Sequence, residues 1–291
     1  MSTAPASASG AAQAAPEASA PTGQSKPSAL GPSFDSVAPV PAPAPAPAPA
    51  VRIDEVSKRF GRGPVVLDDV SLDIAPGEFV CLLGASGCGK STLLNLIAGL
   101  DRPTSGRIET PAEGSAVMFQ ESALMPWLTA RRNVELALRL RGVSRGERRE
   151  KAMSLLDSVN LTDAAEKRPH ELSGGMRQRV ALARALAQDR PVLLMDEPFA
   201  ALDAITRDLL HEELERVWRS TGRTIVFVTH NVREAARLGQ RVVLMGSRPG
   251  RIVQEWKIAK TTGRRIESPE VAALSVEITD QLRKEIRRNA A

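Results

Sequence analysis

The residues with the most evident chemical potential form a glycine-rich segment of the type G-x-x-x-x-G-K-[ST]. The segment consists of Gly84, Ala85, Ser86, Gly87, Cys88, Gly89, Lys90, Ser91 and Thr92. Its glycines lack a Cβ atom, so the backbone can adopt positive φ angles and lie close to an anion. Lys90 supplies a positive charge for the outer phosphates of a ligand, and the Ser91 hydroxyl is the expected Mg²⁺ ligand. The pattern therefore predicts a phosphate-binding loop.

The flanks of this loop favour phosphate binding over an ordinary turn. An apolar run, Phe79 to Leu83, precedes the loop, and an apolar segment from Leu93 to Ile97 follows it. These flanks predict a strand and a helix, which is the context that such a motif requires. Backbone N–H groups at the helix N-terminus then point at the anion. With both elements in place, we do not favour the alternative, a glycine-rich turn with an exposed Lys90.

Polar residues follow two further apolar strands of the predicted sheet. Val192 to Met195 is apolar on both faces, as expected of a central parallel strand, and it is followed by Asp196 and Glu197. Two acids at the end of a buried strand are costly unless a cation or catalysis explains them. A second buried strand, Thr224 to Val228, is followed by Thr229 and His230. Both strands deliver polar groups at their carboxyl ends, where ligands bind in open α/β sheets.

A Leu-Ser-Gly-Gly-Met sequence, Leu172 to Met176, opens a predicted helix. Its glycines lie at the helix N-terminus, where free N–H groups and the macrodipole favour an anion. An ordinary helix cap is the alternative for Ser173 and the two glycines. Phe60 also has two interpretations, because its ring is either part of the core or a surface for an adenine.

Length and composition limit the class of protein. The chain has 291 residues, 42% of them hydrophobic and 3% aromatic, which suits one or two globular domains with aliphatic cores. Its two cysteines, Cys81 and Cys88, form neither a disulfide framework nor a metal set, so we expect a reducing, cytoplasmic compartment. Neither a membrane-spanning run nor a signal peptide is visible. The net charge of +5 is spread among acids on predicted helices, which favours a solvated surface over a nucleic-acid or lipid site.

The chain divides into three predicted regions. Residues 1–50 contain 11 of the 21 prolines and 16 alanines, which predicts a disordered Pro/Ala-rich extension. Residues 51–265 are the predicted catalytic domain, which begins with an antiparallel patch at 51–78 and contains an inserted helical subdomain at about 121–190. Residues 266–291 predict an amphipathic helix that packs on the domain. An exposed loop around Trp127 is either a satellite core or a docking surface. We expect His211 to be solvated and His170 to be structural.

Taken together, these motifs resemble the ATP-binding subunit of ABC transporters over about residues 51–255. Six motifs occur along the chain in the order that is typical of that family. They are the phosphate loop, Gln120 after a strand, Leu172 to Gly175, Val192 to Glu197, Ala201-Leu202-Asp203 and His230. Two positions depart from the usual pattern, because Met176 replaces the commoner Gln and Phe60 replaces the commoner Tyr. The resemblance implies an α/β fold of the P-loop NTPase type, with a parallel core sheet, an N-terminal antiparallel β patch and an inserted α-helical subdomain.

A closer resemblance concerns the importers of aliphatic sulfonates, taurine and nitrate. The segments that carry it are Phe119-Gln120-Glu121, Leu124 to Thr129, Asn133-Val134 and Ser247 to Ile252. Within this group the aliphatic sulfonate importer is our first choice, by a small margin, because this subunit never touches the solute.

The resemblance implies a set of roles for ATP and Mg²⁺. Nucleotide contacts are implied for Phe60, for each residue from Gly84 to Thr92, and for Ser173, Gly174, Gly175 and Asp203. Mg²⁺ contacts are implied for Ser91, Asp196 and Gln120. Glu197 is the expected base or water-orienting group, His230 contacts the γ-phosphate, and Gln120 senses Mg²⁺ and the attacking water. The implied reaction is ATP hydrolysis by in-line attack of water on the γ-phosphate.

The resemblance also implies partners and a location. Two copies of the ATPase subunit form a head-to-tail dimer, in which Ser173 and Gly175 of one copy close on the ATP of the other. Two integral membrane permease subunits hold this dimer at the cytoplasmic face of the inner membrane, and a periplasmic solute-binding protein acts indirectly. No nucleic acid is expected. Soluble ABC ATPases that act on DNA carry a long coiled coil, ribosome-associated ones carry two cassettes, and exporter half-transporters carry their own membrane helices. None of these features is present in the sequence.

Overall fold

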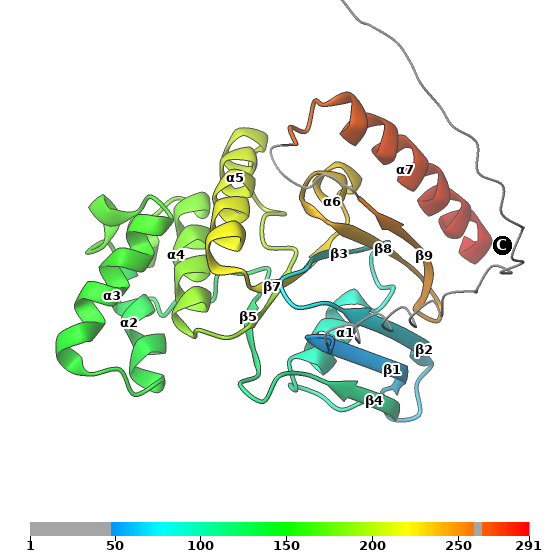
Figure 1. The fold of residues 1–291 in the computed structure, drawn as a ribbon, viewed down its shortest axis with the longest axis horizontal. Coiled ribbons are helices and arrows are strands. Elements are labelled where there is room, and N and C mark those ends of the chain that lie inside the picture. The colour runs from blue at the N-terminus through cyan, green and yellow to red at the C-terminus, as the bar shows by residue number, and fades with distance from the viewer. Residues whose placement is uncertain (1–47, 259–263, 291) are drawn as a thin grey trace, which may run out of the picture. The chain divides into compact units, whose positions relative to one another are not determined.

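The structure, a computed structural model, describes residues 48–258 and 264–290. The predicted disordered extension lies, except for its last three residues, outside the described residues. The described chain contains two sheets covered by helices (Figure 1). The smaller sheet is antiparallel and has the order β2 (Val65–Ile74), β1 (Val51–Arg59) and β4 (Ser105–Glu109). The larger sheet has the order β5 (Ser115–Met118), β6 (Val192–Asp196), β7 (Thr224–Thr229), β3 (Phe79–Gly84), β8 (Arg241–Gly246) and β9 (Arg251–Lys257).

The larger sheet forms the parallel core that the sequence predicts. In this order, β5, β6, β7, β3 and β8 each run parallel to their neighbours, whereas β9 pairs antiparallel with β8. Pairing in register places Asp196 at the end of β6 opposite Val228 in β7. The carboxyl ends of β3, β6 and β7 therefore meet at one edge of the sheet. The α/β fold class with its antiparallel patch is confirmed.

The helices cover both faces of this sheet. They are α1 (Lys90–Ile97), α2 (Ala130–Leu140), α3 (Arg145–Ser158), α4 (Gly174–Ala187), α5 (Ala204–Thr221), α6 (Val232–Leu238) and α7 (Pro269–Ala290). Two short 3₁₀ helices, η1 (Thr162–Ala164) and η2 (Pro169–Glu171), join α3 to α4. Every described element of secondary structure between β5 and β6 is a helix.

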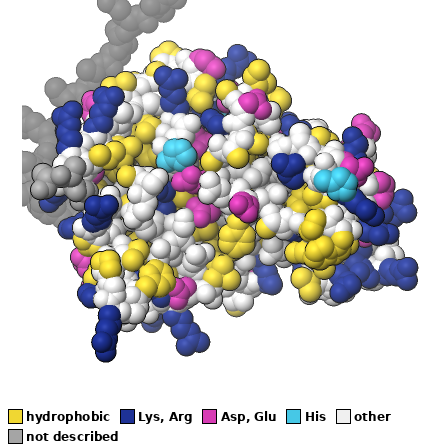
Figure 2. Space-filling model, turned by 180° about the vertical axis from the view of Figure 1, so that it is seen from behind, with side chains coloured by type: hydrophobic (Ala, Val, Ile, Leu, Met, Phe, Trp, Pro, Cys, Tyr) yellow, Lys and Arg dark blue, Asp and Glu magenta, His cyan; other side chains and the backbone are white. Residues whose placement is uncertain are grey.

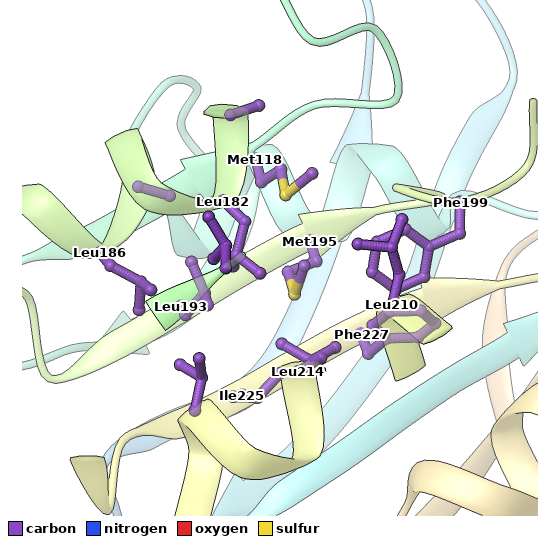
Figure 3. Packing of buried hydrophobic residues seen from close by; sticks show 14 of the residues in the cluster. Met118, Leu182, Leu186, Leu193, Met195, Phe199, Leu210, Leu214, Ile225 and Phe227 are labelled. Atoms are coloured by element: carbon purple, nitrogen blue, oxygen red, sulfur yellow. The ribbon is translucent and has the colours of Figure 1, made fainter. Parts of the chain in front are cut away.

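Alternation along the buried strands divides the interior into two cores. Along β3, Phe79, Cys81 and Leu83 face the core under α4 and α5, whereas Val80 and Leu82 face α1 and the smaller sheet. Side chains of a strand point alternately to its two faces, and both faces are covered here. Figure 3 shows Leu193, Met195, Ile225 and Phe227 of β6 and β7 meeting Leu210 and Leu214 of α5. Such burial fixes the strand ends that carry the polar residues.

Capping residues determine where several helices begin. Thr129 Oγ1 accepts the Arg132 N–H at the start of α2, and Ser144 Oγ accepts the Glu147 N–H at the start of α3. Helix α7 begins at Pro269 after Ser268, whose Oγ accepts the Val271 N–H. One stripe of α7 packs into the core through Val271 and Ile278.

Candidate functional site

The predicted phosphate loop lies between β3 and α1, and its glycines meet two different requirements. Gly87 and Gly89 have φ angles of 79° and 99°, which side chains rarely allow. At Gly89 a Cβ atom would also lie 2.6 Å from the Leu67 side chain. Gly84 differs, because its φ angle is not positive and a Cβ atom there would lie 2.7 Å from the Met245 carbonyl oxygen. The expectation of a positive φ is therefore wrong for Gly84, which is required by close packing instead.

The Lys90 side chain lies inside this loop rather than in solvent. The residue is 5% exposed, and its Nζ donates to the carbonyl oxygens of Gly84, at 2.9 Å, and Ala85, at 3.0 Å. An exposed lysine on a turn, the alternative interpretation of the motif, is excluded by this burial. The ammonium group is held at the start of α1, where helix N–H groups also favour an anion.

One cavity of about 370 Å³ brings together half of the residues that the sequence predicts for the site. Its lining consists of Val66, Ser86, Gly87, Gly89, Lys90, Ser91, Thr92, Gln120, Asp196 and Glu197. Gln120 reaches the cavity from the segment after β5, and Gln178 of α4 fixes that segment by donating to the Gln120 carbonyl oxygen at 2.8 Å. Val66 was not predicted, since a valine in a strand carries no chemical signal.

Ser91 and Asp196 form the part of this cavity that suits a divalent cation. Burial raises the pKa of Asp196, and a hydrogen bond between the Ser91 and Asp196 side chains works in the opposite direction. A hydroxyl and a carboxylate are hard oxygen donors of the kind that Mg²⁺ selects. Within the described residues, no group of three or more His, Cys, Asp and Glu side chains could hold a metal ion. The donor set therefore fits a Mg²⁺ ion that takes its remaining ligands from substrate phosphates and water.

Glu197 and His230 face one another beyond the ends of β6 and β7. His230 Nδ1 lies 2.8 Å from Glu197 Oε2, and the side chains are 57% and 19% exposed respectively. Glu197 has an unusual φ of 42°, and its N–H donates to the Val228 carbonyl oxygen at 3.0 Å. A non-glycine residue with positive φ at a sheet edge is typical of a functional site.

The Ser173 to Gly175 segment lies outside this cavity. Ser173 is the N-cap of α4, with its Oγ accepting the Met176 N–H at 3.2 Å, so the ordinary cap is present. A Cβ atom at Gly175 would lie 2.5 Å from Thr206 Cγ2, so α4 and α5 require a glycine there. Gly174 lines a separate cavity of about 650 Å³, which Gln120 also lines. None of the three residues lines the phosphate-loop cavity.

Asp203 and Phe60 are also not among the residues that line the phosphate-loop cavity. Asp203 is the N-cap of α5, and its hydrogen bonds with Thr206 lower the pKa of its carboxyl group. Phe60 is 52% exposed, with Lys58 Nζ 4.7 Å from the ring centroid, so the core alternative for its ring is excluded. The phosphate-loop cavity of one copy is therefore lined by only part of the predicted nucleotide contacts.

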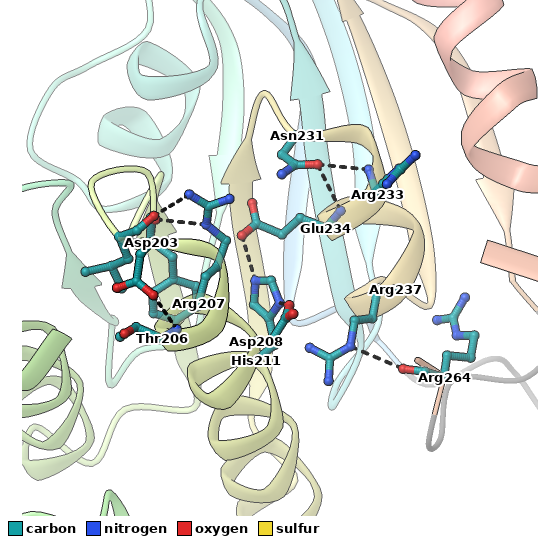
Figure 4. A network of polar contacts seen from close by, with 12 residues as sticks. Asp203, Thr206, Arg207, Asp208, His211, Asn231, Arg233, Glu234, Arg237 and Arg264 are labelled. Atoms are coloured by element: carbon teal, nitrogen blue, oxygen red, sulfur yellow. Dashed lines mark hydrogen bonds and ion pairs between the residues drawn. The ribbon is translucent and has the colours of Figure 1, made fainter. Parts of the chain in front are cut away.

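Two histidine predictions are wrong, and one of them concerns the site. His170 was expected to be structural but is exposed on η2. His211 was expected to be solvated but is fully buried, and its Nε2 lies 2.7 Å from Glu234 Oε1 (Figure 4). Sequence reasoning placed His211 on the wrong face of its helix because its partner, Glu234, is 23 residues away.

The charged side chains are distributed unevenly over the visible face of the molecule. Figure 2 shows Lys and Arg side chains mainly around its rim, with several gathered at its right-hand end, and several Asp and Glu side chains near its centre. Among the described residues, no helix combines the length and apolar character needed to cross a bilayer.

The fold and the phosphate-loop cavity define a P-loop nucleotide-binding protein. The family described as "ABC transporter" matches residues 67–200. The chain is 49% identical to the taurine import ATP-binding protein TauB of Chromobacterium violaceum over 69% of its length and 80% of that protein. It is 50% identical to the nitrate import ATP-binding protein NrtD of Synechocystis over 68% of its length and 77% of that protein. The chain belongs to the family of ABC transporter ATP-binding proteins.

A solved structure of this family has the same fold. The ATP-binding cassette MJ0796, dimeric in a post-hydrolysis state and bound to ADP and Pi, superposes with a TM-score of 0.63. It is 35% identical, and the match covers 72% of this chain and 99% of that chain.

Proposed function

We propose that this chain is the ATP-hydrolysing subunit of an ABC importer for a small oxyanion. The observation that carries the proposal is the division of the site. One cavity gathers the phosphate loop, Asp196, Glu197 and Gln120, whereas the Ser173 to Gly175 segment lies outside it. A second copy of the chain supplies that segment across a head-to-tail interface, so ATP is bound between two copies. The dimeric cassette MJ0796 supports this arrangement.

The residues of the cavity account for hydrolysis by positioning and charge. Lys90 and the loop N–H groups hold the β- and γ-phosphates, and Ser91 and Asp196 hold Mg²⁺. The bound Mg²⁺ neutralises the charge that develops on the phosphate oxygens. Glu197 orients the attacking water and accepts its proton, while His230 contacts the γ-phosphate.

The geometry around Glu197 and His230 supports these last two roles. Glu197 lies at the wall of the cavity and His230 lies next to it, 2.8 Å away. A carboxylate already oriented by an imidazole is prepared to orient a water molecule without further rearrangement. Gln120 lines both this cavity and the neighbouring groove that Gly174 lines.

That groove is the surface that we assign to a membrane permease subunit. It has a volume of about 650 Å³ and is lined by residues 120–124 and by Gly174, Arg177, Gln178 and Leu202, among others. Trp127 follows this segment and is 68% exposed, which excludes the satellite core as its role. Two permease subunits would place the ATPase dimer peripherally at the cytoplasmic face of the inner membrane. Movement of Gln120 would then couple the groove to the Mg²⁺ site.

The solute class is inferred from relatives. TauB and NrtD are named for the import of taurine and of nitrate. Both solutes carry a small oxyanion group, and taurine is itself an aliphatic sulfonate. We therefore keep aliphatic sulfonates as the first choice, with taurine and nitrate as the close alternatives.

Two experiments test the proposal. The purified chain should hydrolyse Mg-ATP, and its rate per subunit should rise with protein concentration because two copies form each site. A concentration-independent rate for isolated monomers would overturn the shared site, and stimulation by DNA or RNA would favour a different class of ABC ATPase. Calorimetric titration of the associated solute-binding protein with alkanesulfonates, taurine and nitrate then identifies the solute. Binding of none of these would overturn the oxyanion assignment.

A further inference from the structure

His211 forms a buried link between two segments of the site. It lies on α5 with no exposed surface, and its Nε2 is 2.7 Å from Glu234 Oε1 on α6. A carboxylate only accepts hydrogen bonds, so the Nε2–H donates to Glu234. The other ring nitrogen, Nδ1, has no hydrogen-bond partner among the described residues, and the Asp208 carboxylate lies 3.6 Å from it. The side chain of Glu234 is itself 7% exposed.

Glu234 connects His211 to the turn that carries His230. Its second carboxylate oxygen accepts the hydroxyl of Thr229, which is a buried residue. The Thr229 Oγ1 in turn accepts the Asn231 N–H at 3.0 Å, and Asn231 Oδ1 accepts the Glu234 N–H at 3.3 Å (Figure 4). These bonds hold the residues immediately before and after His230. The orientation of His230 therefore depends on the Glu234 carboxylate.

The opposite side of His211 contacts the segment that follows Glu197. The Phe199 ring packs edge-on against the imidazole, with centroids 5.6 Å apart and an angle of 61°. Phe199 is 1% exposed and lies two residues after Glu197. One imidazole therefore packs against the segment that follows Glu197 and is linked through the Glu234 carboxylate to the turn that carries His230. A displacement of His211 would therefore act on both segments that carry Glu197 and His230.

We infer that His211 is a positioning residue for ATP hydrolysis, which holds Glu197 and His230 at their 2.8 Å separation. The inference rests on the proposed function. Removing the Nε2–H leaves the buried Glu234 carboxylate with an unmet hydrogen bond, and the Thr229–Asn231 turn is then no longer fixed. Displacement of a catalytic group by about 1 Å is enough to lower a rate by roughly two orders of magnitude.

Steady-state ATPase kinetics of the full chain test this role. His211→Leu keeps an apolar side chain against Phe199 but removes the donor, and it should lower kcat about tenfold or more while leaving the KM for Mg-ATP within about twofold. His211→Gln retains an N–H donor and should recover most of kcat. Leu214→Ala, one turn further along α5, is the control for a general loss of packing, and it should lower Tm without lowering kcat of the folded protein.

A double-mutant cycle separates positioning from stability. In a His230→Ala background, His211→Leu should cause little further loss of kcat, because both changes act on the same pair. Equal losses in the two backgrounds, or an unchanged kcat in His211→Leu, would overturn the inference. If His211→Leu does not fold, Thr229→Val decides the question by removing the next hydroxyl of the link, and it should lower kcat in the same way. Absence of Mg-ATP hydrolysis by the wild type would instead remove the proposed function, and the inference with it.

Discussion

His230 Nδ1 and Glu197 Oε2 lie 2.8 Å apart, although the residues are 33 positions apart in the sequence. They follow β6 and β7, which are hydrogen-bonded neighbours. The strand register and the bond from the Glu197 N–H to the Val228 carbonyl oxygen fix the backbone on both sides of this contact. The sheet therefore presents the Glu197 carboxylate at the wall of the phosphate-loop cavity, with the His230 imidazole next to it.

Glu197→Gln should trap ATP-bound dimers. The amide keeps the shape of the side chain but cannot accept a proton, so we expect hydrolysis to fall by about 10²- to 10⁴-fold with ATP affinity retained. Single-turnover hydrolysis and size-exclusion chromatography in Mg-ATP measure the two effects. Unchanged turnover would reject the role of Glu197.

Lys90→Ala should abolish ATP-dependent dimerisation. Loss of the buried ammonium removes a charge-assisted contact to phosphate, which corresponds to a fall in ATP affinity of roughly 10- to 100-fold. Calorimetry of ATP binding checks this expectation. Lys151→Ala, on the exposed side of α3, is the control and should bind ATP normally. Normal affinity in Lys90→Ala would count against the phosphate-loop assignment.

Ser173→Arg should spare ATP binding and stop hydrolysis. Ser173 does not line the cavity of its own chain, so a bulky cation there obstructs only the partner copy. The change also removes a helix cap, which costs about 1 kcal/mol. Ser144→Arg removes the equivalent cap of α3 and should leave hydrolysis intact. Full activity in Ser173→Arg would contradict a shared site.

The phosphate loop and the strand-end acids could be predicted because their signals are local. The loop from Gly84 to Thr92 is recognised by the fixed spacing of its glycines and Lys90. Asp196 and Glu197 are recognised because they directly follow an apolar run. Strand pairing then brings them together without further information, because parallel strands end at the same edge of a sheet. The sequence also offered an ordinary cap as the alternative for Ser173, and this cap is present, since capping depends on neighbouring residues.

Other features depend on contacts that the sequence does not reveal. Strand β4, Ser105–Glu109, has one partly buried residue, Ile108, so it shows no apolar alternation. Gly106 in this strand allows the close approach of β1, because a Cβ atom there would lie 2.3 Å from the Glu55 carbonyl oxygen. His211 was missed for a similar reason, since only the fold brings Glu234 and Phe199 to it.

Helix α7 should contribute to stability through its buried stripe. Ile278 is fully buried, whereas Ile286 on the same helix is 47% exposed. We expect Ile278→Ala to lower the free energy of unfolding by about 2–4 kcal/mol and Ile286→Ala to lower it by less than about 1 kcal/mol. Urea denaturation of both variants provides the comparison. Equal effects would show that α7 does not pack as described.

Asp196→Asn should raise Tm and abolish hydrolysis. Burial raises the pKa of Asp196, which means that ionisation costs more free energy in the folded than in the unfolded chain. Ionised Asp196 therefore lowers the stability of the wild-type fold at pH values above its folded-state pKa. This loss of stability disappears as the pH falls below the pKa of Asp196 in the unfolded chain. We expect the Tm of Asp196→Asn to exceed that of the wild type at pH 7 in EDTA, and the difference to shrink towards pH 4.

The partly exposed Asp101 provides a control of opposite sign for this experiment. A hydrogen bond from Lys58 lowers the pKa of Asp101, so its ionised form stabilises the fold above the unfolded pKa. Asp101→Asn should therefore lower Tm at pH 7, with a difference that is lost as the pH falls through the folded pKa, and should leave Mg-ATP hydrolysis unchanged. Thermal melts between pH 4 and pH 8 measure both variants. A lower Tm for Asp196→Asn at pH 7 would contradict the conclusion that the buried Asp196 carboxylate destabilises the fold when no cation is bound.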